Sequence, residues 1–285
     1  MEMQGKICVV TGASRGVGKG IALALGEQGA TVYVTGRSGE ESTSLLGGTV
    51  AATAAEVTAR GGKGIAVCCD HGDENAVRAL FEQVRAEQGR LDILVNNAIA
   101  LPKDLTVVAP FWKKSLAALS LLDVGLHSGY VDTWYAAPLL LESKGLVVFT
   151  SSFGGTCYMH GPAYGAGKAG TDKMAHDMAH DFKPFGVTAV SIWPGLVKTE
   201  LTVSLLAAEP DKYGAAAKMA ESPEFPGHVI AALYRDPERQ SLSGSVQVVA
   251  ELAKRYGITD QDGRQPPSYR KALGDPPVFS KAVVG

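Results

Sequence analysis

Tyr164 and Lys168 are the two residues of this sequence whose types and spacing most clearly suggest proton-transfer chemistry. They lie four positions apart near the start of an expected helix, which places both side chains on one helical face. A free tyrosine has a pKa of about 10, and a neighbouring ammonium favours the phenolate. Lowering that pKa by about three units corresponds to roughly 4 kcal/mol of differential stabilisation, which a desolvated lysine together with the positive ring of a bound cofactor could supply. Tyr164 would then exchange a proton with a carbonyl or alcohol oxygen near neutral pH.

A tyrosine and a lysine at this spacing occur by chance on many helices, so the surrounding sequence has to supply the context. The expected strand Leu146–Thr150 ends directly before Ser151 and Ser152. In open α/β sheets the carboxyl ends of parallel strands carry the ligand crevice. A hydroxyl there can hydrogen-bond a substrate oxygen and stabilise the charge that develops on it. We therefore expect one of these serines to act together with Tyr164 and Lys168.

A glycine-rich turn follows the first expected strand and is typical of a dinucleotide-binding site. Glycine at positions 12, 16 and 18 lets the backbone turn tightly and approach a pyrophosphate, whose charge is met by the amide groups that open the next helix. Gly18-Lys19 is followed by Gly20 rather than by Ser or Thr, which disfavours a nucleotide triphosphatase. The turn residues expected to contact the cofactor are Gly12, Ser14, Arg15, Gly16, Val17 and Gly18.

Two arginines indicate which form of the cofactor is bound. An enzyme for the unphosphorylated dinucleotide normally carries Asp or Glu at the end of the second strand, where it bonds the ribose 2′-hydroxyl. Here the second strand is followed by Arg37, and Arg15 lies within the glycine turn. Guanidinium groups match phosphate oxygens. We therefore expect NADP(H) to be preferred, and the residues leave NAD(H) open as an alternative.

The elements that must position these residues follow from the hydrophobic pattern. Short runs rich in Val and Ile alternate with longer amphipathic stretches, which is typical of strands buried on both faces and joined by crossover helices. The expected strands are Ile7–Thr11, Thr31–Thr35, Gly64–Cys69, Leu91–Asn96, Leu146–Thr150, Thr188–Trp193 and Ser245–Val249. The expected helices are Val17–Gln28, Val50–Arg60, Glu74–Gln88, Phe111–Leu141, Tyr164–Phe182 and Pro226–Tyr234. The sequence thus predicts an α/β fold with a Rossmann-type, doubly wound parallel sheet in a single domain.

Composition agrees with one domain and excludes several function classes. A chain of 285 residues with 46% hydrophobic content can bury one sizeable core. We expect residues 1–250 to form the dinucleotide-binding catalytic domain and 251–285 to form a C-terminal tail that packs on the surface or stays partly disordered. The net charge of −2 and the scattered Lys and Arg residues argue against nucleic acid as a partner.

The same composition bears on compartment. The four cysteines match neither metal-ligand spacing nor a disulfide framework. No signal peptide is readable, and no stretch approaches the roughly 20 apolar residues that a membrane span needs. We therefore expect a cytoplasmic protein. His176 and His180 have a metal-ligand spacing on one expected helix, but the proton-transfer chemistry needs no metal and no third ligand is convincingly placed, so we expect no metal site.

Several motifs in this order and at these distances resemble the short-chain dehydrogenase/reductase family. The motifs are the turn Thr11-Gly12-Ala13-Ser14-Arg15-Gly16-Val17-Gly18, Asn96-Asn97-Ala98, the Ser151-Ser152 strand end, Tyr164 with Lys168, and Pro194-Gly195. The match spans roughly residues 5 to 244. The resemblance implies a nicotinamide-dependent oxidoreductase with this Rossmann-type fold.

By this resemblance Tyr164 is the acid/base and also contacts the cofactor. Lys168 both lowers the pKa of Tyr164 and binds the nicotinamide ribose. A serine at the end of the fifth strand orients the substrate oxygen. The usual family spacing of thirteen residues before Tyr164 gives Ser151, whereas aligning the strand end and the following Gly155 favours Ser152.

The resemblance also implies cofactor contacts outside the glycine turn. Asp70 would contact the adenine and Asn97 the ribose region. The nicotinamide end would be contacted by Pro194, Gly195, Val197 and Thr199.

Two positions depart from the family pattern. Ile99 stands where the family usually has the glycine of Asn-Asn-Ala-Gly. Where a helix asparagine normally completes a proton relay, the aligned segment reads Leu122-Asp123-Val124-Gly125. Asp123 at that place would add negative charge near Lys168 and alter the relay.

These observations together predict an oxidoreductase that transfers hydride between NADP(H) and a carbonyl or alcohol carbon, with Tyr164 as acid/base. The Ala- and Leu-rich segment at about 200–222 is expected to form a lid, and its apolar content suggests a small hydrophobic substrate. The alternative is a catalytically silent sensor or scaffold that binds the dinucleotide and turns nothing over. The family resemblance implies self-association as a homodimer or homotetramer through the long helices.

Overall fold

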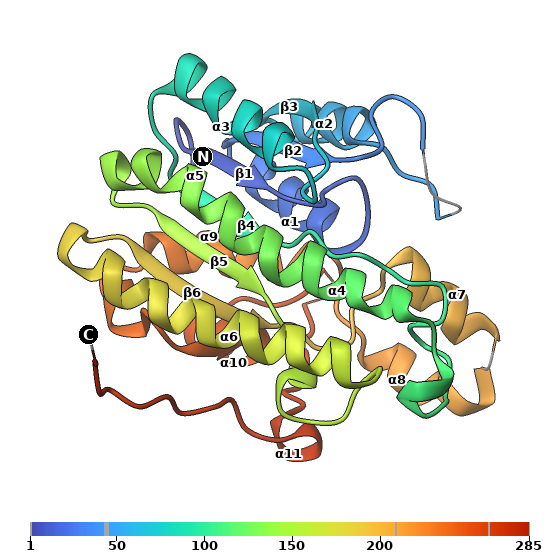
Figure 1. Cartoon of the computed structure of the whole chain (residues 1–285). Helices are drawn as coiled ribbons and strands as arrows, with labels where there is room; N and C mark the ends of the chain where they lie inside the picture. Colours follow the sequence, from blue (N-terminus) through green and yellow to red (C-terminus); the bar gives the residue numbers. More distant parts are fainter. Residues whose placement is uncertain (1, 43–45, 209, 262, 285) are drawn as a thin grey trace.

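The structure is a computed structural model, and it describes residues 2–42, 46–208, 210–261 and 263–284. Within these residues seven parallel strands form one sheet in the order β3-β2-β1-β4-β5-β6-β7 (Figure 1). The strands are β1 (Ile7–Val10), β2 (Thr31–Gly36), β3 (Lys63–Cys68), β4 (Ile93–Asn96), β5 (Leu146–Thr150), β6 (Thr188–Trp193) and β7 (Val246–Val248). The strand order reverses between β1 and β4, and ligands of open α/β sheets bind at such a switch point.

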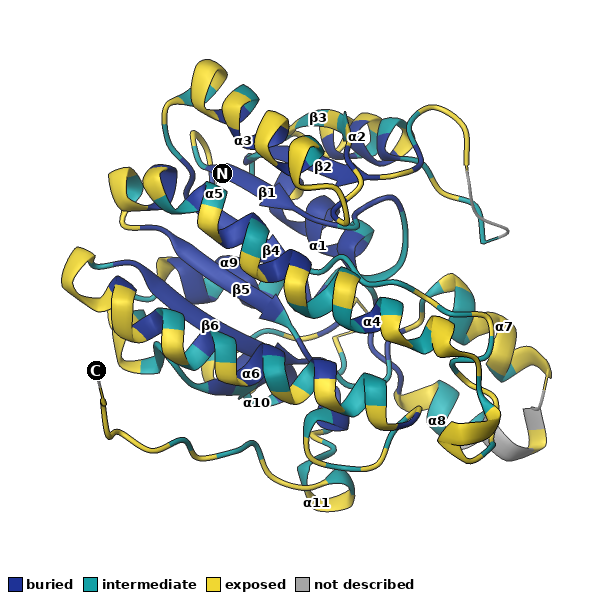
Figure 2. Ribbon diagram, in the orientation of Figure 1, coloured by how far each residue is buried: buried dark blue, intermediate teal, exposed yellow. Residues whose placement is uncertain are grey.

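Helices cover both faces of the sheet, which explains why the central strands β1, β4 and β5 are almost entirely apolar. Figure 2 shows the central strands as buried, and Val9, Leu94 and Val148 have no exposed surface. The helices are α1 (Gly16–Glu27), α2 (Val50–Ala59), α3 (Glu74–Gln88), α4 (Ser120–Leu122), α5 (Ser128–Ser143), α6 (Pro162–Phe182), α7 (Glu200–Ala208), α8 (Pro210–Met219), α9 (Phe225–Arg235), α10 (Val249–Tyr256) and α11 (Arg270–Leu273). One core lies between the sheet and α1, α2, α9 and α10, and the other lies between the sheet and α3, α5 and α6. The predicted doubly wound parallel sheet in a single domain is therefore confirmed.

The single helix predicted over Phe111–Leu141 is wrong. The chain forms two short 3-10 turns, then α4, and becomes regular only in α5. At the break, Val124 has φ −110° and ψ 99°, and Gly125 has φ 143°, a value that side-chain-bearing residues rarely adopt. The Val124 carbonyl leaves the helical pattern and accepts a hydrogen bond from Ala100 N at 2.9 Å. The break therefore turns Gly125 toward the carboxyl ends of β4 and β5.

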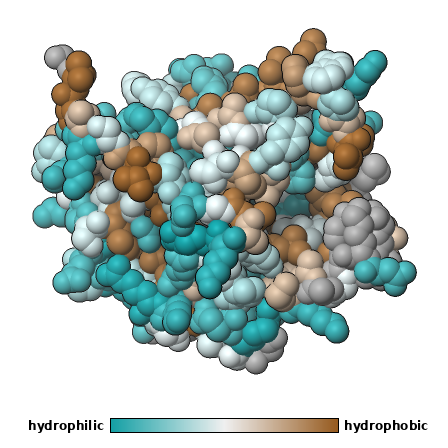
Figure 3. Space-filling view, turned by 90° about the horizontal axis from the view of Figure 1, so that it is seen from below, coloured by the Kyte–Doolittle hydropathy of each residue, from teal (hydrophilic) through white to brown (hydrophobic). Residues whose placement is uncertain are grey.

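The segment after residue 250 is more ordered than a surface tail. Helix α10 begins at Val249 and buries Leu252 and Ala253 in the core that also contains α1 and α9. Further on, Tyr269 and Leu273 pack against a small cluster around Phe153 and Trp193. Figure 1 shows the last residues running as an extended chain past α11. Seen from below, hydrophobic and hydrophilic side chains are interspersed on the surface (Figure 3).

A buried polar cluster joins the ends of β2 and β3 to α5. His71 Nδ1 lies 2.8 Å from Asp132 Oδ1, and His71 Nε2 lies 2.7 Å from Thr35 Oγ1. Burial lowers the pKa of His71, but the attraction of Asp132 outweighs that effect and raises the pKa to about 10. The cluster is thus a buried ion pair at neutral pH. It holds the strand ends from which Arg37 and Asp70 extend.

Candidate active site

The glycine turn forms a tight concave loop at the switch point. Gly12 and Gly16 have φ values of 64° and 58°, which explains why glycine occupies both positions. A Cβ on Gly18 would lie 2.4 Å from Asn97 Nδ2 and 2.5 Å from Gly12 O, so only glycine fits there. Asn97 Nδ2 in turn donates to Thr11 O at 2.9 Å, which ties the end of β4 to the turn. Helix α1 begins at Gly16, and its first amides face this loop.

Two cationic side chains lie beside the turn. Burial lowers the pKa of Arg15, the negative charge of Glu200 opposes that shift, and the positive charge of Arg37 adds to it. Arg15 Nη1 donates to Gly47 O at 3.3 Å, while Arg37 is exposed. Paired cations of this kind suit a doubly charged anion such as a phosphate. Ser14 is buried and its carbonyl oxygen accepts from Thr53 Oγ1 at 3.5 Å, so Ser14 packs toward α2.

The structure brings Tyr164 and Ser152 together. Helix α6 begins at Pro162, whose fixed φ suits the first helical position, and this start places Tyr164 in the first turn. Tyr164 Oη donates to Ser152 Oγ at 3.0 Å. Ser151 points elsewhere, because its Oγ donates to Lys168 O at 3.1 Å. The geometry therefore pairs Ser152, rather than Ser151, with the tyrosine.

Lys168 lies one turn along α6 from Tyr164. Its Nζ donates to Thr150 O at 2.8 Å and lies 5.8 Å from the centroid of the Tyr164 ring. Burial lowers the pKa of Lys168 to about 8, and the attraction of Asp172 opposes that shift. Lys168 is therefore a buried cation that stays charged at neutral pH.

In the chain by itself, the pKa of Tyr164 is raised rather than lowered. Burial raises the pKa of Tyr164, the hydrogen bond to Ser152 lowers it, and nearby Cys157 raises it slightly. The desolvation effect is the largest because a buried phenolate loses its water. Lys168 Nζ lies beside the ring and bonds to Thr150 O, rather than contacting the phenol oxygen. Stabilising the phenolate would thus require a further positive group in the crevice.

Asp172 is a residue of this site that sequence reasoning missed. It is buried one turn beyond Lys168 on α6 and accepts hydrogen bonds from Ser191 Oγ at 2.5 Å and Trp193 Nε1 at 3.1 Å. Its carboxylate is the charged group that helps to keep Lys168 protonated. The spacing of four residues after Lys168 was the signal that could have found it.

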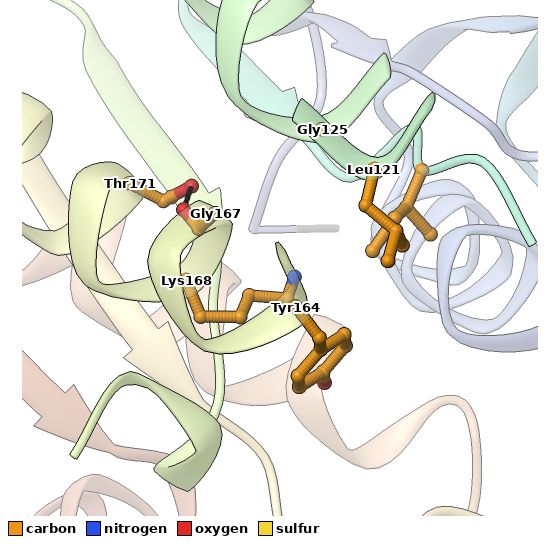
Figure 4. Close-up of a pocket in the computed structure, with 7 residues that line it drawn as sticks. Leu121, Gly125, Tyr164, Gly167, Lys168 and Thr171 are labelled. Carbon is orange, nitrogen blue, oxygen red and sulfur yellow. Dashed lines mark hydrogen bonds between the residues drawn. The ribbon is translucent and has the colours of Figure 1, made fainter. Parts of the chain in front are cut away.

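Asp123 does not add charge near Lys168, so that expectation is wrong. Asp123 is exposed, and Gly125 occupies the position that faces the site. Gly125 and Leu121 lie across a small cavity from Tyr164 and Lys168 (Figure 4). The cavity has a volume of about 10 Å³, a size at which a single water begins to fit. Its remaining lining residues are Ile99, Gly167 and Thr171.

The loop after β6 closes the crevice from the other side. Pro194 and Val197 are buried, and Thr199 lies directly over the glycine turn, because a Cβ on Gly16 would meet Thr199 Cγ2 at 3.5 Å. The next residue, Glu200, accepts a hydrogen bond from Gly16 N at 3.0 Å through Oε2. A carboxylate thus occupies an anion position at the start of α1. Sequence reasoning missed this contact because it joins positions 184 residues apart.

The remaining expected cofactor residues are spread along the same crevice. Val17 is half-buried in the first turn of α1. Asp70 is exposed beyond the end of β3, where its Oδ1 accepts from Gly72 N at 3.0 Å. The glycine turn, Asn97, the loop after β6 and the α6 pair all lie at the carboxyl ends of the strands. This arrangement fits a dinucleotide, because three glycines shape a turn that a Cβ would fill and the open end of α1 faces it.

Comparison with known proteins identifies the family. The short chain dehydrogenase family profile matches residues 6–210, and the chain belongs to that family. It is an oxidoreductase with the Rossmann-type fold of short-chain dehydrogenases, as the sequence predicted.

The chain is similar to mouse "Dehydrogenase/reductase SDR family member 1", with 43% identity over 279 residues that cover 94% of this chain and 87% of the relative. Among solved structures it is similar to a putative dehydrogenase from Xanthomonas campestris, with a TM-score of 0.76, 26% identity and 98% coverage of both chains. It is also similar to a metagenomic short-chain oxidoreductase determined in complex with NADP. That likeness has a TM-score of 0.67 and 28% identity, and it covers 84% of this chain and 95% of the other.

Metal ligation and membrane crossing find no support within the described ranges. There, no group of three or more His, Cys, Asp or Glu side chains is arranged to hold a metal ion. His176, one of the two histidines at metal-ligand spacing, has its Nδ1 2.8 Å from Gly244 O. None of the described helices combines the length and apolarity needed to cross a bilayer.

Proposed function

We propose that this protein transfers hydride between NADP(H) and the carbonyl or alcohol carbon of a small hydrophobic substrate. The observation that carries the proposal is the Tyr164 Oη to Ser152 Oγ hydrogen bond of 3.0 Å, next to the buried cation of Lys168. When bound, the nicotinamide would supply or accept the hydride. In the direction of reduction, Tyr164 gives its proton to the substrate oxygen, while Ser152 hydrogen-bonds that oxygen and orients it.

Lys168 and Asp172 support the proton transfer in this proposal. The charge of Lys168, together with the positive charge of the oxidised nicotinamide when that is bound, would favour the phenolate that forms once Tyr164 has given up its proton. Asp172 keeps Lys168 protonated in its buried position. The cofactor would be held by the glycine turn, Asn97 and the loop of Pro194, Gly195, Val197 and Thr199, with Asp70 at the adenine and Lys168 at the nicotinamide ribose.

A direct test is to purify the protein, identify any bound or added dinucleotide by mass, and follow cofactor oxidation against a panel of carbonyl compounds. We expect NADPH to bind and to be oxidised by at least one hydrophobic ketone or aldehyde. Titratable binding without turnover of any compound in either direction would instead support a dinucleotide sensor or scaffold.

Arg37 provides a prediction about cofactor preference. Replacing it in Arg37→Ala removes one of two cations proposed to meet the 2′-phosphate, and charged hydrogen bonds contribute about 1.5–3 kcal/mol. We expect the affinity for NADPH to fall about 10- to 100-fold and the affinity for NADH to change less than about twofold. Fluorescence titration of both cofactors measures this. Arg60→Ala, which removes an arginine at the C-terminal end of α2, is the matched control. Equal losses of affinity for NADPH and NADH in Arg37→Ala would contradict the assignment of Arg37 to the 2′-phosphate.

Segment 200–222 is proposed to be the substrate lid, and within it the structure describes helices α7 and α8 but not residue 209. The lid begins with Glu200, whose carboxylate contacts the turn where the cofactor phosphates are proposed to bind.

Because two anions cannot share the Gly16 amide without repulsion, Glu200→Gln should bind NADPH about two- to fivefold more tightly. Calorimetric titration of the wild-type protein, Glu200→Gln and Asp211→Asn measures the difference. Asp211 is an exposed acid of the same lid, so its replacement should leave the affinity unchanged. Weaker binding by Glu200→Gln would show that Glu200 helps the cofactor instead of competing with it.

We further propose that the protein acts in the cytoplasm, where its four free cysteines would stay reduced, and that it forms a homodimer or homotetramer, as the family likeness implies. Light scattering of the purified protein tests the assembly. A monomer at micromolar concentration would contradict it.

A further inference from the structure

Glu221 is a completely buried acid at the point where the chain leaves the lid. Its Oε1 accepts a hydrogen bond from Gly195 N at 3.0 Å. Its backbone N donates to Leu196 O at 2.7 Å, and its backbone O accepts from Lys198 N at 2.9 Å. Both the side chain and the main chain of Glu221 therefore hold the loop that follows β6.

Gly195 is packed tightly between Glu221 and the C-terminal segment. A Cβ at this position would lie 2.6 Å from Glu221 Oε1 and 2.8 Å from Tyr269 Cε2. The Tyr269 ring also contacts Phe153 edge-on, with centroids 6.4 Å apart, and Phe153 follows the proposed catalytic Ser152. Glu221 and Tyr269 thus both pack against Gly195 in the loop of residues 194–199.

Two buried oxygens at this contact lower the stability of the folded protein. Glu221 Oε2 and Tyr269 Oη are both buried and make no hydrogen bond to any residue that the structure describes. A buried oxygen without a donor costs free energy, and an apolar side chain of similar size would avoid that cost. A carboxyl at such a position therefore points to a role in function.

The groups around Glu221 determine its protonation. Asp260 accepts hydrogen bonds from Ser222, and Arg264 Nη2 donates to Ala220 O at 2.9 Å, so both lie beside the residues that flank Glu221. Burial raises the pKa of Glu221 to about 8, and Asp260 contributes to the rise, while the Gly195 amide and Arg264 lower it. Tyr269 is the remaining titratable group that faces the carboxyl. Glu221 is therefore mostly protonated at neutral pH.

We propose that Glu221 is the positioning residue of the cofactor-binding loop at residues 194–199, and that it holds this loop in its binding conformation only while its carboxyl is neutral. An ionised carboxylate with one oxygen lacking a donor is unstable in this buried place. Ionisation favours conformations in which Glu221 reaches water, and these break the bonds to Gly195, Leu196 and Lys198. This inference rests on the proposed function, because that proposal assigns the loop to the nicotinamide end of the cofactor.

The first test is the stability of the protein without added cofactor. Glu221 has a folded-state pKa of about 8, above its unfolded value of 4.5, so its stabilising contribution is complete below pH 4.5 and is lost as pH rises toward 8. Chemical unfolding between pH 5 and pH 8 should show the wild-type protein losing stability relative to Glu221→Gln. The ratio of their unfolding constants should change by at least about tenfold.

The second test is NADPH affinity at pH 7 and pH 9. Between these two pH values the dissociation constant of the wild-type protein should rise about tenfold more than that of Glu221→Gln. The reason is that the Glu221 carboxyl loses its proton in this range and glutamine has none to lose. Lys168, whose pKa is about 8, titrates in both proteins and cancels in the ratio. Tyr269→Phe removes the hydroxyl and keeps the ring, so it should retain the wild-type pH dependence.

The outcomes separate the two proposals. A wild-type protein that fails to bind NADPH at pH 7 contradicts the proposed function, and with it the role of the loop. Normal binding with the same pH dependence in the wild-type protein and Glu221→Gln contradicts only the inference about Glu221. Loss of the pH dependence of NADPH affinity in Tyr269→Phe would likewise contradict only the inference about Glu221. If Glu221→Gln does not fold, Asp260→Asn replaces it, and the loss of affinity should then shift to lower pH.

Discussion

Tyr164→Phe is expected to lower kcat/KM by about 1,000-fold, within the 10²- to 10⁴-fold range of general acid catalysis, while NADPH affinity changes less than about threefold. The variant keeps the aromatic ring and removes the hydroxyl that donates to Ser152 Oγ. Binding of the dinucleotide depends on the glycine turn and on neighbouring loops, which the substitution does not touch. Steady-state kinetics with a carbonyl substrate, together with fluorescence titration of NADPH, separate the two effects.

A matched pair of serine variants sharpens this prediction. Ser152→Ala removes the hydrogen-bond partner of Tyr164 and should also reduce turnover strongly, whereas Ser151→Ala removes a hydroxyl that bonds to Lys168 O and should reduce it far less. Tyr158→Phe is the control for Tyr164→Phe, because Tyr158 lies in the loop that precedes α6 and is 78% exposed. Substantial turnover by Tyr164→Phe would refute the assignment of Tyr164 as the general acid. A larger loss of turnover in Ser151→Ala than in Ser152→Ala would show that Ser151, rather than Ser152, acts with it.

The largest expected effect on stability comes from Asp132→Ala. Asp132 and His71 form a buried pair in which the Nδ1 to Oδ1 distance is 2.8 Å, and both side chains are almost completely buried. Removing one partner leaves a buried imidazole whose charge is no longer compensated, which typically costs about 3–5 kcal/mol. Urea unfolding at pH 7 measures the loss. Asp177→Ala, which breaks an exposed pair with Lys173, should cost less than about 1 kcal/mol.

The pH dependence of stability identifies the pair independently. His71 has a folded-state pKa of about 10, above its usual value of 6.5, so its contribution is complete below pH 6.5 and is lost as pH rises through 10. Asp132→Ala should lack that alkaline decline. A double variant with leucine at both positions should recover part of the lost stability, because it leaves no uncompensated buried charge. If Asp132→Ala unfolds like the wild-type protein across this range, the ion pair does not contribute.

Local patterns were sufficient to predict most of the framework. The runs Ile7–Val10 and Leu146–Thr150 are apolar without interruption, and only strands covered on both faces require that. The glycine turn was readable because the backbone at Gly12 and Gly16 has positive φ values, which favour glycine locally. Tyr164 and Lys168 were readable because two residues four positions apart on a helix lie on the same face. Each of these features depends on neighbours within a few positions of the chain.

The break in the helix at Gly125 shows where local patterns were insufficient. Residues 111–141 contain enough apolar and helix-favouring side chains to predict one continuous helix. The structure interrupts it because the Val124 carbonyl bonds to Ala100 N, a partner from another segment. Asp123, which the family resemblance singled out, is exposed, whereas Gly125 lines the cavity beside Lys168.

The amino-acid sequence by itself predicted the family through the resemblance of its motifs, and it predicted the parallel sheet, the glycine-rich turn and the tyrosine with its lysine through periodicity and short spacings. Only the tertiary structure decided which serine meets Tyr164, which acid supports Lys168, and that Glu200 and Glu221 contact Gly16 and Gly195. Apart from the Lys168–Asp172 pair on one helix, these contacts join different elements of the fold. Their geometry exists only after the sheet and its helices have packed, since a side chain's charge and partners depend on which distant segments bury it.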